Sequence, residues 1–267
     1  MQPLEKKRSN QNRLDRILVI EDDPIFLRLY RHLLSAHHRS YELVECTDGY
    51  AALGRMLERT PRLVLLDLTM PRFDGAGFLA IVKSKPELSS LPIIVISSDA
   101  DEAHRRIGDL ENVRWFSKPI QLKTLQHMLE LELGKPEAGR KESAIPPCKT
   151  DPREFDQTQL ETYVGCNRIA QETIAHQFCL LAAERLAMLE RFIGNPDRLG
   201  LRTLAHVLEG SAATLGAPRL LAECKRLRRS LDAGHADECV REEVVALANA
   251  LRCFTVTLAQ HFELTDF

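Results

Sequence analysis

The run 63-LVLLD-67 shows how the first half of the chain folds, because four successive apolar residues end in an aspartate. Segments with helical periodicity, such as residues 48–59, separate this run from others of its kind. Strands that are apolar on both faces and alternate with helices are typical of a parallel sheet covered by helices on both sides. The sequence therefore predicts an α/β domain of five βα units. The other apolar runs are 17-ILVI-20, 42-ELVEC-46, 92-PIIVISS-98 and 113-VRWFS-117.

The pattern changes at 134-GKPEAGRKESAIPPCKTDP-152, which contains four prolines and two glycines and has no periodicity. This composition is typical of a linker. Long helical patterns follow, separated by glycine and proline, and they predict an antiparallel bundle of four main helices. These patterns cover residues 167–193, 196–216, 218–234 and 237–262, with a short one before them at 156–164. The predicted organisation is a flexible N-terminus at 1–13, the α/β domain at 14–134, the linker at 135–153 and the bundle at 154–264.

The composition of the 267 residues excludes several classes of protein. Residues 1–134 carry 19 Lys and Arg against 19 Asp and Glu, and residues 135–267 carry 17 against 19, so neither half has the basic excess of a nucleic-acid binder. No apolar run approaches the roughly 18 residues of a membrane span, and the N-terminus lacks the apolar core of a signal peptide. The seven scattered cysteines read as free thiols. We expect a cytoplasmic protein with neither nucleic acid nor membrane as a partner.

Acidic residues collect where the predicted strands end. Glu21 and Asp22 follow the first strand and Asp67 ends the third. In a doubly wound, flavodoxin-like sheet of order 2-1-3-4-5 these two strands are neighbours, so the three carboxylates converge in one crevice. Their mutual repulsion calls for a bound cation, and hard oxygen ligands with room for water favour Mg²⁺.

The segments 17-ILVIEDDP-24, 65-LLDLTMPRFDG-75 and 115-WFSKPI-120, with Ser97 between them, occur in an order that resembles the receiver domain of two-component response regulators. The resemblance covers residues 14–134. It implies that Asp67 accepts a phosphoryl group from a phosphohistidine. It also implies that Asp22, Asp67 and the carbonyl of Thr69 bind Mg²⁺ beside Glu21.

The same resemblance assigns the remaining roles in this domain. Lys118 supplies a positive charge to the phosphate oxygens, and the Ser97 hydroxyl moves onto the phosphoryl group. Trp115 stands where the family usually has a tyrosine or phenylalanine that follows this movement. The family also has a cis peptide before Pro119. The segment 101-DEAHRRIGDLENVRWF-116 is short, so we expect an altered fourth helix.

The second domain has a histidine in an apolar stretch, 205-AHVLEGSAATLGA-217. On a helix, one stripe turns toward a core and His206 lies roughly opposite it, so we expect an exposed imidazole. Gly210 and Ala213 share the face of His206, and an interior glycine costs a helix about 1 kcal/mol relative to alanine. Such bare space predicts a docking surface for another protein. The stripe consists of Leu204, Leu208, Ser211 and Leu215.

Residues 205–220 resemble the histidine phosphotransfer (Hpt) domain, and the match covers 154–264. The resemblance implies that His206 carries phosphate. The family commonly has lysine three residues later, whereas this chain has Glu209, which would repel a phosphoryl group. Arg202, on nearly the same face, could compensate. We predict that Glu209→Lys raises the rate of phosphorylation of His206 or the lifetime of its phosphorylated form.

Together these patterns predict a two-component phosphorelay protein that transfers phosphate through Asp67 and His206. The sequence shows neither an ATP-binding kinase module nor a DNA-binding output, so a sensor histidine kinase and a separate receiver protein are the expected partners. The linker also allows transfer with the chain's own receiver domain. Whether the chain is an enzyme in its own right stays open. One alternative is a phosphorylation-gated binding regulator with an inactive Hpt-like bundle. Another is an Mg²⁺-dependent phosphatase with Asp67 as nucleophile.

Overall fold

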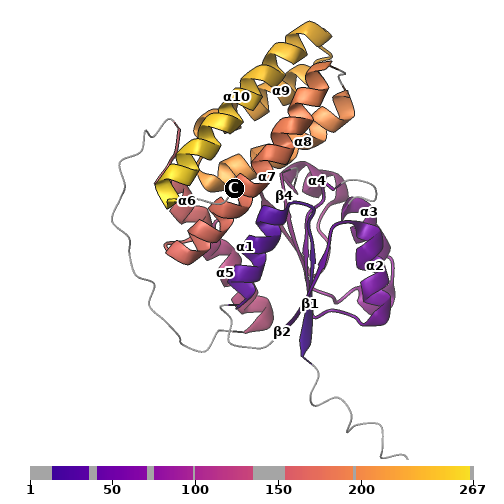
Figure 1. Cartoon of the computed structure of the whole chain (residues 1–267). Helices are drawn as coiled ribbons and strands as arrows, with labels where there is room; N and C mark the ends of the chain where they lie inside the picture. Colours follow the sequence, from indigo (N-terminus) through magenta and orange to yellow (C-terminus); the bar gives the residue numbers. More distant parts are fainter. Residues whose placement is uncertain are drawn as a thin grey trace, which may run out of the picture.

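The computed structural model describes residues 14–35, 41–70, 75–98, 100–134, 154–194 and 197–264. The predicted N-terminal segment 1–13 and the linker 135–153 lie outside these ranges. Figure 1 shows an α/β domain with a bundle of long helices across one end of its sheet. Among the described helices, none is both long and apolar enough to cross a membrane.

Five parallel strands form one sheet in the order β2-β1-β3-β4-β5, which confirms the predicted order. The register sets Leu18 of β1 beside Val44 of β2 and Val64 of β3. Because the strands are parallel, their carboxyl ends meet at one edge of the sheet. The strands are β1 (Asp15–Ile20), β2 (Tyr41–Cys46), β3 (Leu63–Leu66), β4 (Ile93–Ser97) and β5 (Val113–Ser117).

Helices cover both faces of the sheet, as the continuous apolar strands require. One face packs Ile17 and Val19 of β1 with α1 and α5. The other packs Leu18 and Ile20 with α2 and α3. The helices of this domain are α1 (Pro24–Ser35), α2 (Gly49–Glu58), α3 (Gly75–Lys83), the 3-10 helix η1 (Pro86–Leu88), α4 (Ala100–Ile107) and α5 (Leu122–Leu133).

Residues 157–262 form the helical domain, in which a short helix precedes four longer ones. Asp197 begins α8 by accepting hydrogen bonds from the backbone of Leu199 and Gly200. Gly216 ends it at φ 71°, where a side chain would also meet the carbonyl oxygen of Asp156 at 2.1 Å. Glycine is required there because of both the backbone conformation and the close approach. The helices are α6 (Gln157–Val164), α7 (Arg168–Gly194), α8 (Arg198–Leu215), α9 (Pro218–Asp232) and α10 (Asp237–Phe262).

The two domains pack against each other through α1. The apolar core beneath α1 and α5 continues without a break into the core of the bundle, so Phe26 and Phe178 belong to the same cluster. Arg28 of α1 donates a hydrogen bond of 2.7 Å to Gln177 of α7. Figure 1 shows α7 and α8 beside α1, across the end of the sheet where the strands finish. The helical domain therefore lies over the edge at which functional residues of such a sheet collect.

Candidate functional site

Three carboxylates meet at the carboxyl ends of β1 and β3. Glu21 and Asp22 follow β1, and the backbone N–H of Asp67 donates to the carbonyl of Ile20, which ties the two strand ends together. One oxygen from each of Glu21, Asp22 and Asp67 lies within 4.8 Å of the others. The predicted convergence of these side chains is thus present in the structure.

The electrostatics of this cluster favour a cation. Burial raises the pKa of Glu21 well above its usual range, and the charge of Asp67 adds to the shift. Burial and the charge of Asp67 also raise the pKa of Asp22 to about 6. Crowded oxygen ligands that resist ionisation together are the donor set that a hard divalent ion stabilises. The residues present therefore fit a metal ion.

Lys118 neutralises part of this charge. Its Nζ lies 2.6 Å from Glu21 Oε2 and 2.7 Å from Asp67 Oδ2, in a buried position. Burial alone would lower the pKa of Lys118, but the carboxylates of Asp67 and Glu21 outweigh that effect and raise it. The ammonium also lies 4.2 Å from the centre of the Phe26 ring. The peptide bond from Lys118 to Pro119 is cis, which confirms that prediction.

Ser97 and Trp115 come from the neighbouring strands β4 and β5. Ser97 is fully buried at the end of β4, and its hydroxyl is 3.2 Å from that of Thr69. The backbone N–H of Thr69 donates to Asp67 at 3.0 Å. Trp115 of β5 stacks on His104 of α4, with ring centroids 5.1 Å apart. The indole is half-buried on the α4 side of the sheet.

The cluster also depends on Gly75, to which the sequence alone assigns no role. A Cβ at this position would lie 2.1 Å from the carbonyl oxygen of Asp67 and 2.7 Å from Cα of Leu68. Gly75 donates a backbone hydrogen bond to that same Leu68. The start of α3 therefore packs directly on the backbone that carries Asp67.

His206 of α8 faces this cluster from the helical domain. It lines the same small cavity as Asp67 and Lys118. The imidazole is half-buried rather than fully exposed. Helical periodicity predicts an open face, but the other domain covers part of that face. Gly210 and Ala213 on the same face are buried, and a Cβ on Gly210 would lie 3.1 Å from the ring of Phe26.

Ser211 differs from the other members of its predicted stripe. Its hydroxyl lies 2.9 Å from Asp23 of the α/β domain, so it faces the other domain and not only the bundle core. Leu204, Leu208 and Leu215 are buried as predicted. A hydroxyl group at this position is stabilised by a carboxylate that only the packing of the two domains supplies.

The charges beside His206 are paired differently from the prediction. Glu209 lies 2.7 Å from Arg228 of α9, and Arg202 lies 2.7 Å from Asp232. Arg228, rather than Arg202, therefore compensates Glu209. The sequence alone does not indicate this pair, because partners 19 positions apart follow no helical spacing.

Residues 17–130 match the model of the response regulator receiver domain, and residues 173–252 match that of the Hpt domain. The chain is a receiver domain followed by an Hpt domain. Both matches lie on the elements described above, the first on β1 to α5 and the second on α7 to α10.

Three curated proteins illustrate the likeness. The signal transduction histidine-protein kinase BarA of Escherichia coli (strain K12) is 25% identical over 248 residues, covering 88% of this chain and 26% of BarA. The sensor protein GacS of Pseudomonas syringae pv. syringae is 26% identical over 244 residues, 86% of this chain and 26% of GacS. The receiver domain alone is 29% identical over 121 residues to the response regulator DivK of Brucella anthropi, 44% of this chain and 95% of DivK. The chain thus spans about a quarter of the length of BarA and GacS.

Solved structures match the receiver domain as well. The phosphorylated cyanobacterial response regulator RcpA is 27% identical, with a TM-score of 0.39 over 45% of this chain and 94% of RcpA. The receiver domain of sensor histidine kinase PA1611 from Pseudomonas aeruginosa PAO1, solved with a magnesium ion, is 22% identical, with a TM-score of 0.40 over 46% of this chain and 99% of that domain.

Proposed function

We propose that the chain is a phosphorelay protein in which Asp67 accepts a phosphoryl group and His206 exchanges it with an aspartate of a receiver. The observation that carries this proposal is that Asp67, Lys118 and His206 line one cavity. A carboxylate, a cation and an imidazole in that arrangement suit transfer of a phosphoryl group between oxygen and nitrogen.

The first step joins phosphate to Asp67. An oxygen of the carboxylate forms a bond to phosphorus while the bond from phosphorus to the imidazole nitrogen of a histidine kinase breaks. Lys118 already contacts Oδ2 of Asp67 and can follow the charge onto the phosphate oxygens. Glu21, Asp22, Asp67 and the carbonyl of Thr69 would hold Mg²⁺, which supplies further neutralisation of that charge when bound.

The second step transfers the phosphoryl group to or from His206. A ring nitrogen of neutral imidazole bonds to phosphorus as the bond to an aspartyl oxygen breaks, and the carboxylate is regenerated. The displaced ring proton passes to water. The partners of this chemistry are a sensor histidine kinase, a separate receiver protein and the chain's own receiver domain.

Arg228 weakens the case for an inactive bundle. That alternative rested on repulsion between Glu209 and phosphate, and Glu209 already has a cationic partner at 2.7 Å. The ion pair reduces the negative charge that a phosphoryl group on His206 would meet.

The test follows a ³²P label through the chain and its Asp67→Ala and His206→Ala variants after incubation with a phosphorylated histidine kinase. Aspartyl phosphate is labile to alkali and phosphohistidine is labile to acid, so the two sites are separable. We expect alkali-labile label on the His206→Ala variant and acid-labile label on the wild-type chain. Label confined to aspartate, with none reaching His206 from any receiver, would overturn the proposal and favour the binding regulator. Continuous release of inorganic phosphate without dependence on His206 would favour the phosphatase.

A further inference from the structure

A buried polar contact joins the two domains beside the Asp67 cavity. Asp23 of the receiver domain accepts a hydrogen bond of 2.9 Å from Ser211 and lies 3.4 Å from Arg185 of α7. All three side chains are buried. We call this set, together with Phe26 against Gly210, the interdomain contact.

Asp23 is held in place by its own domain. Its Oδ1 accepts a hydrogen bond of 2.9 Å from the backbone N–H of Ile25, which fixes the carboxylate at the start of α1. The carboxylate therefore points at the Hpt domain with little freedom. Arg185 is a matched partner, because it stands on the inward stripe of α7 with Ala182 and Leu189, where an arginine without an acidic partner would be costly.

The pairing favours this receiver domain over others. A receiver without an acid at the position of Asp23 would cover Arg185 and leave its charge uncompensated, which disfavours such a complex. Ser211 contributes less to the selection of a receiver domain, since its hydroxyl also lies 3.1 Å from the carbonyl of Val207. The hydroxyl keeps that acceptor when the two domains separate. The charge of Arg185 is therefore the main selective feature.

Docking narrows the space beside Asp67. His206, Val207 and Gly210 of α8 form one wall, and the remaining volume is about 10 Å³. A space of that size holds about one water molecule. A phosphoryl donor is larger than a water molecule, so α8 hinders its approach to Asp67 from this side. A donor therefore reaches Asp67 more readily once α8 has moved away.

We propose that the Asp23–Arg185 pair holds the Hpt domain on its own receiver domain in a closed form that shields Asp67 from external phosphodonors. The proposal rests on the proposed function only in taking Asp67 as the phosphoacceptor. Opening of the interdomain contact precedes phosphorylation, and the closed form also covers the face around His206 that a second receiver would use.

The test measures how fast ³²P-acetyl phosphate labels the full-length chain in the presence of Mg²⁺. In this reaction an oxygen of Asp67 bonds to phosphorus and acetate leaves with the electrons of the broken bond. Arg185→Met keeps the aliphatic bulk and removes the charge. We expect it to raise the initial labelling rate at least roughly tenfold, because the loss of one partner of a buried charge pair destabilises an interface. Small-angle scattering should show a larger radius of gyration.

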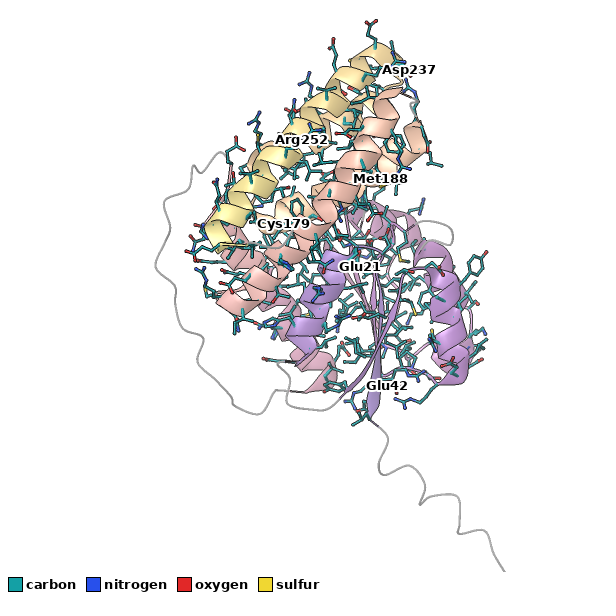
Figure 2. All side chains as sticks on the ribbon, in the orientation of Figure 1. Glu21, Glu42, Cys179, Met188, Asp237 and Arg252 are labelled. Carbon is teal, nitrogen blue, oxygen red and sulfur yellow. The ribbon has the colours of Figure 1, made fainter. Side chains whose placement is uncertain are left out.

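Arg252→Met is the matched control. It removes an exposed ion pair with Glu190, on the α10 side of the bundle and far from Glu21 (Figure 2). It should leave both the labelling rate and the radius of gyration at the wild-type values. A rise with this variant equal to that of Arg185→Met would overturn the assignment to the interdomain contact.

Gly210→Leu provides a second way to separate the domains. Leucine favours a helix interior over glycine, so α8 is strengthened, while its side chain meets the Phe26 ring. We expect faster labelling and a larger radius here too. Folded variants at both positions with wild-type rates and radii would overturn the closed form. Label that never reaches His206 would instead count against the proposed function, and the radius of gyration still decides the closed form if no label is incorporated at all.

Discussion

The two ends of the proposed phosphate transfer differ in how they arrange charge. Around Asp67, three carboxylates and Lys118 are concentrated in a buried cluster. Around His206, Glu209 is paired with Arg228 and Arg202 with Asp232, all on the bundle itself. An anionic nucleophile needs nearby cations before it can attack a phosphoryl group, whereas neutral imidazole does not. The difference predicts that charge substitutions have large effects at the first end and small ones at the second.

Lys118→Met should cause the largest loss. It removes the cation that lies 2.7 Å from Asp67 Oδ2, and we expect labelling of Asp67 by acetyl phosphate to slow about a hundredfold, the usual scale for a preorganised group at developing charge. Initial rates of alkali-labile incorporation provide the measurement. A loss of less than threefold would show that the cation contributes little, and the contrast between the two ends would then disappear.

Asp22→Asn should weaken Mg²⁺ binding. The substitution removes one charged ligand from a cluster that lies within 4.8 Å, and we expect the dissociation constant for Mg²⁺ to rise at least about tenfold. Isothermal titration calorimetry measures the constant directly, and chelation of Mg²⁺ in the wild-type chain should stop labelling. The control is Asp48→Asn at the start of α2, which should leave the constant unchanged.

Gly75→Ala tests the backbone that carries Asp67 rather than the charge around it. The new Cβ would overlap the Asp67 carbonyl, so we expect the free energy of unfolding to fall by about 1–3 kcal/mol. Gly54→Ala in α2 has open space around it and should be neutral or slightly stabilising. Denaturant melts of both variants provide the comparison. Equal stability of the two would mean that α3 can shift away without cost.

Glu209→Lys should have the smallest effect. Since Arg228 already compensates Glu209, we expect the phosphorylation rate and lifetime of His206 to change less than about fivefold, the range of partly exposed ion pairs. Arg228→Met is the informative comparison, because it leaves Glu209 without this cation. It should slow phosphorylation of His206 more than Arg202→Met does. If Glu209→Lys raised the phosphorylation rate or the lifetime well beyond fivefold, the repulsion by Glu209 that the sequence predicts would be supported after all.

Local patterns were sufficient to predict most of the fold. The apolar runs 17–20, 63–67 and 92–98 end within one residue of the ends of β1, β3 and β4, and the sheet order followed from the class of fold. The convergence of Glu21, Asp22 and Asp67 was predictable because parallel strands end at one edge. The orientation of His206 away from the bundle core followed from helical periodicity.

The sequence indicated the contacts between distant charged residues only weakly. Asp23 extends the acidic pair by one residue, and Arg185 breaks the apolar stripe of α7. The sequence does not show that these two residues contact each other. Their contact joins positions 162 apart, and no periodicity relates residues across a linker. The same holds for Glu209 and Arg228, which lie on different helices.

The sequence by itself therefore determined the two domains, the strand-end carboxylates and the helix that carries His206, because these depend on short-range periodicity and on the geometry of single elements. The tertiary structure decided which receiver faces His206, which cation pairs with Glu209 and how little room remains beside Asp67. Those features depend on side chains that meet only when two packed surfaces come together. Burial then makes each charge depend on its partner.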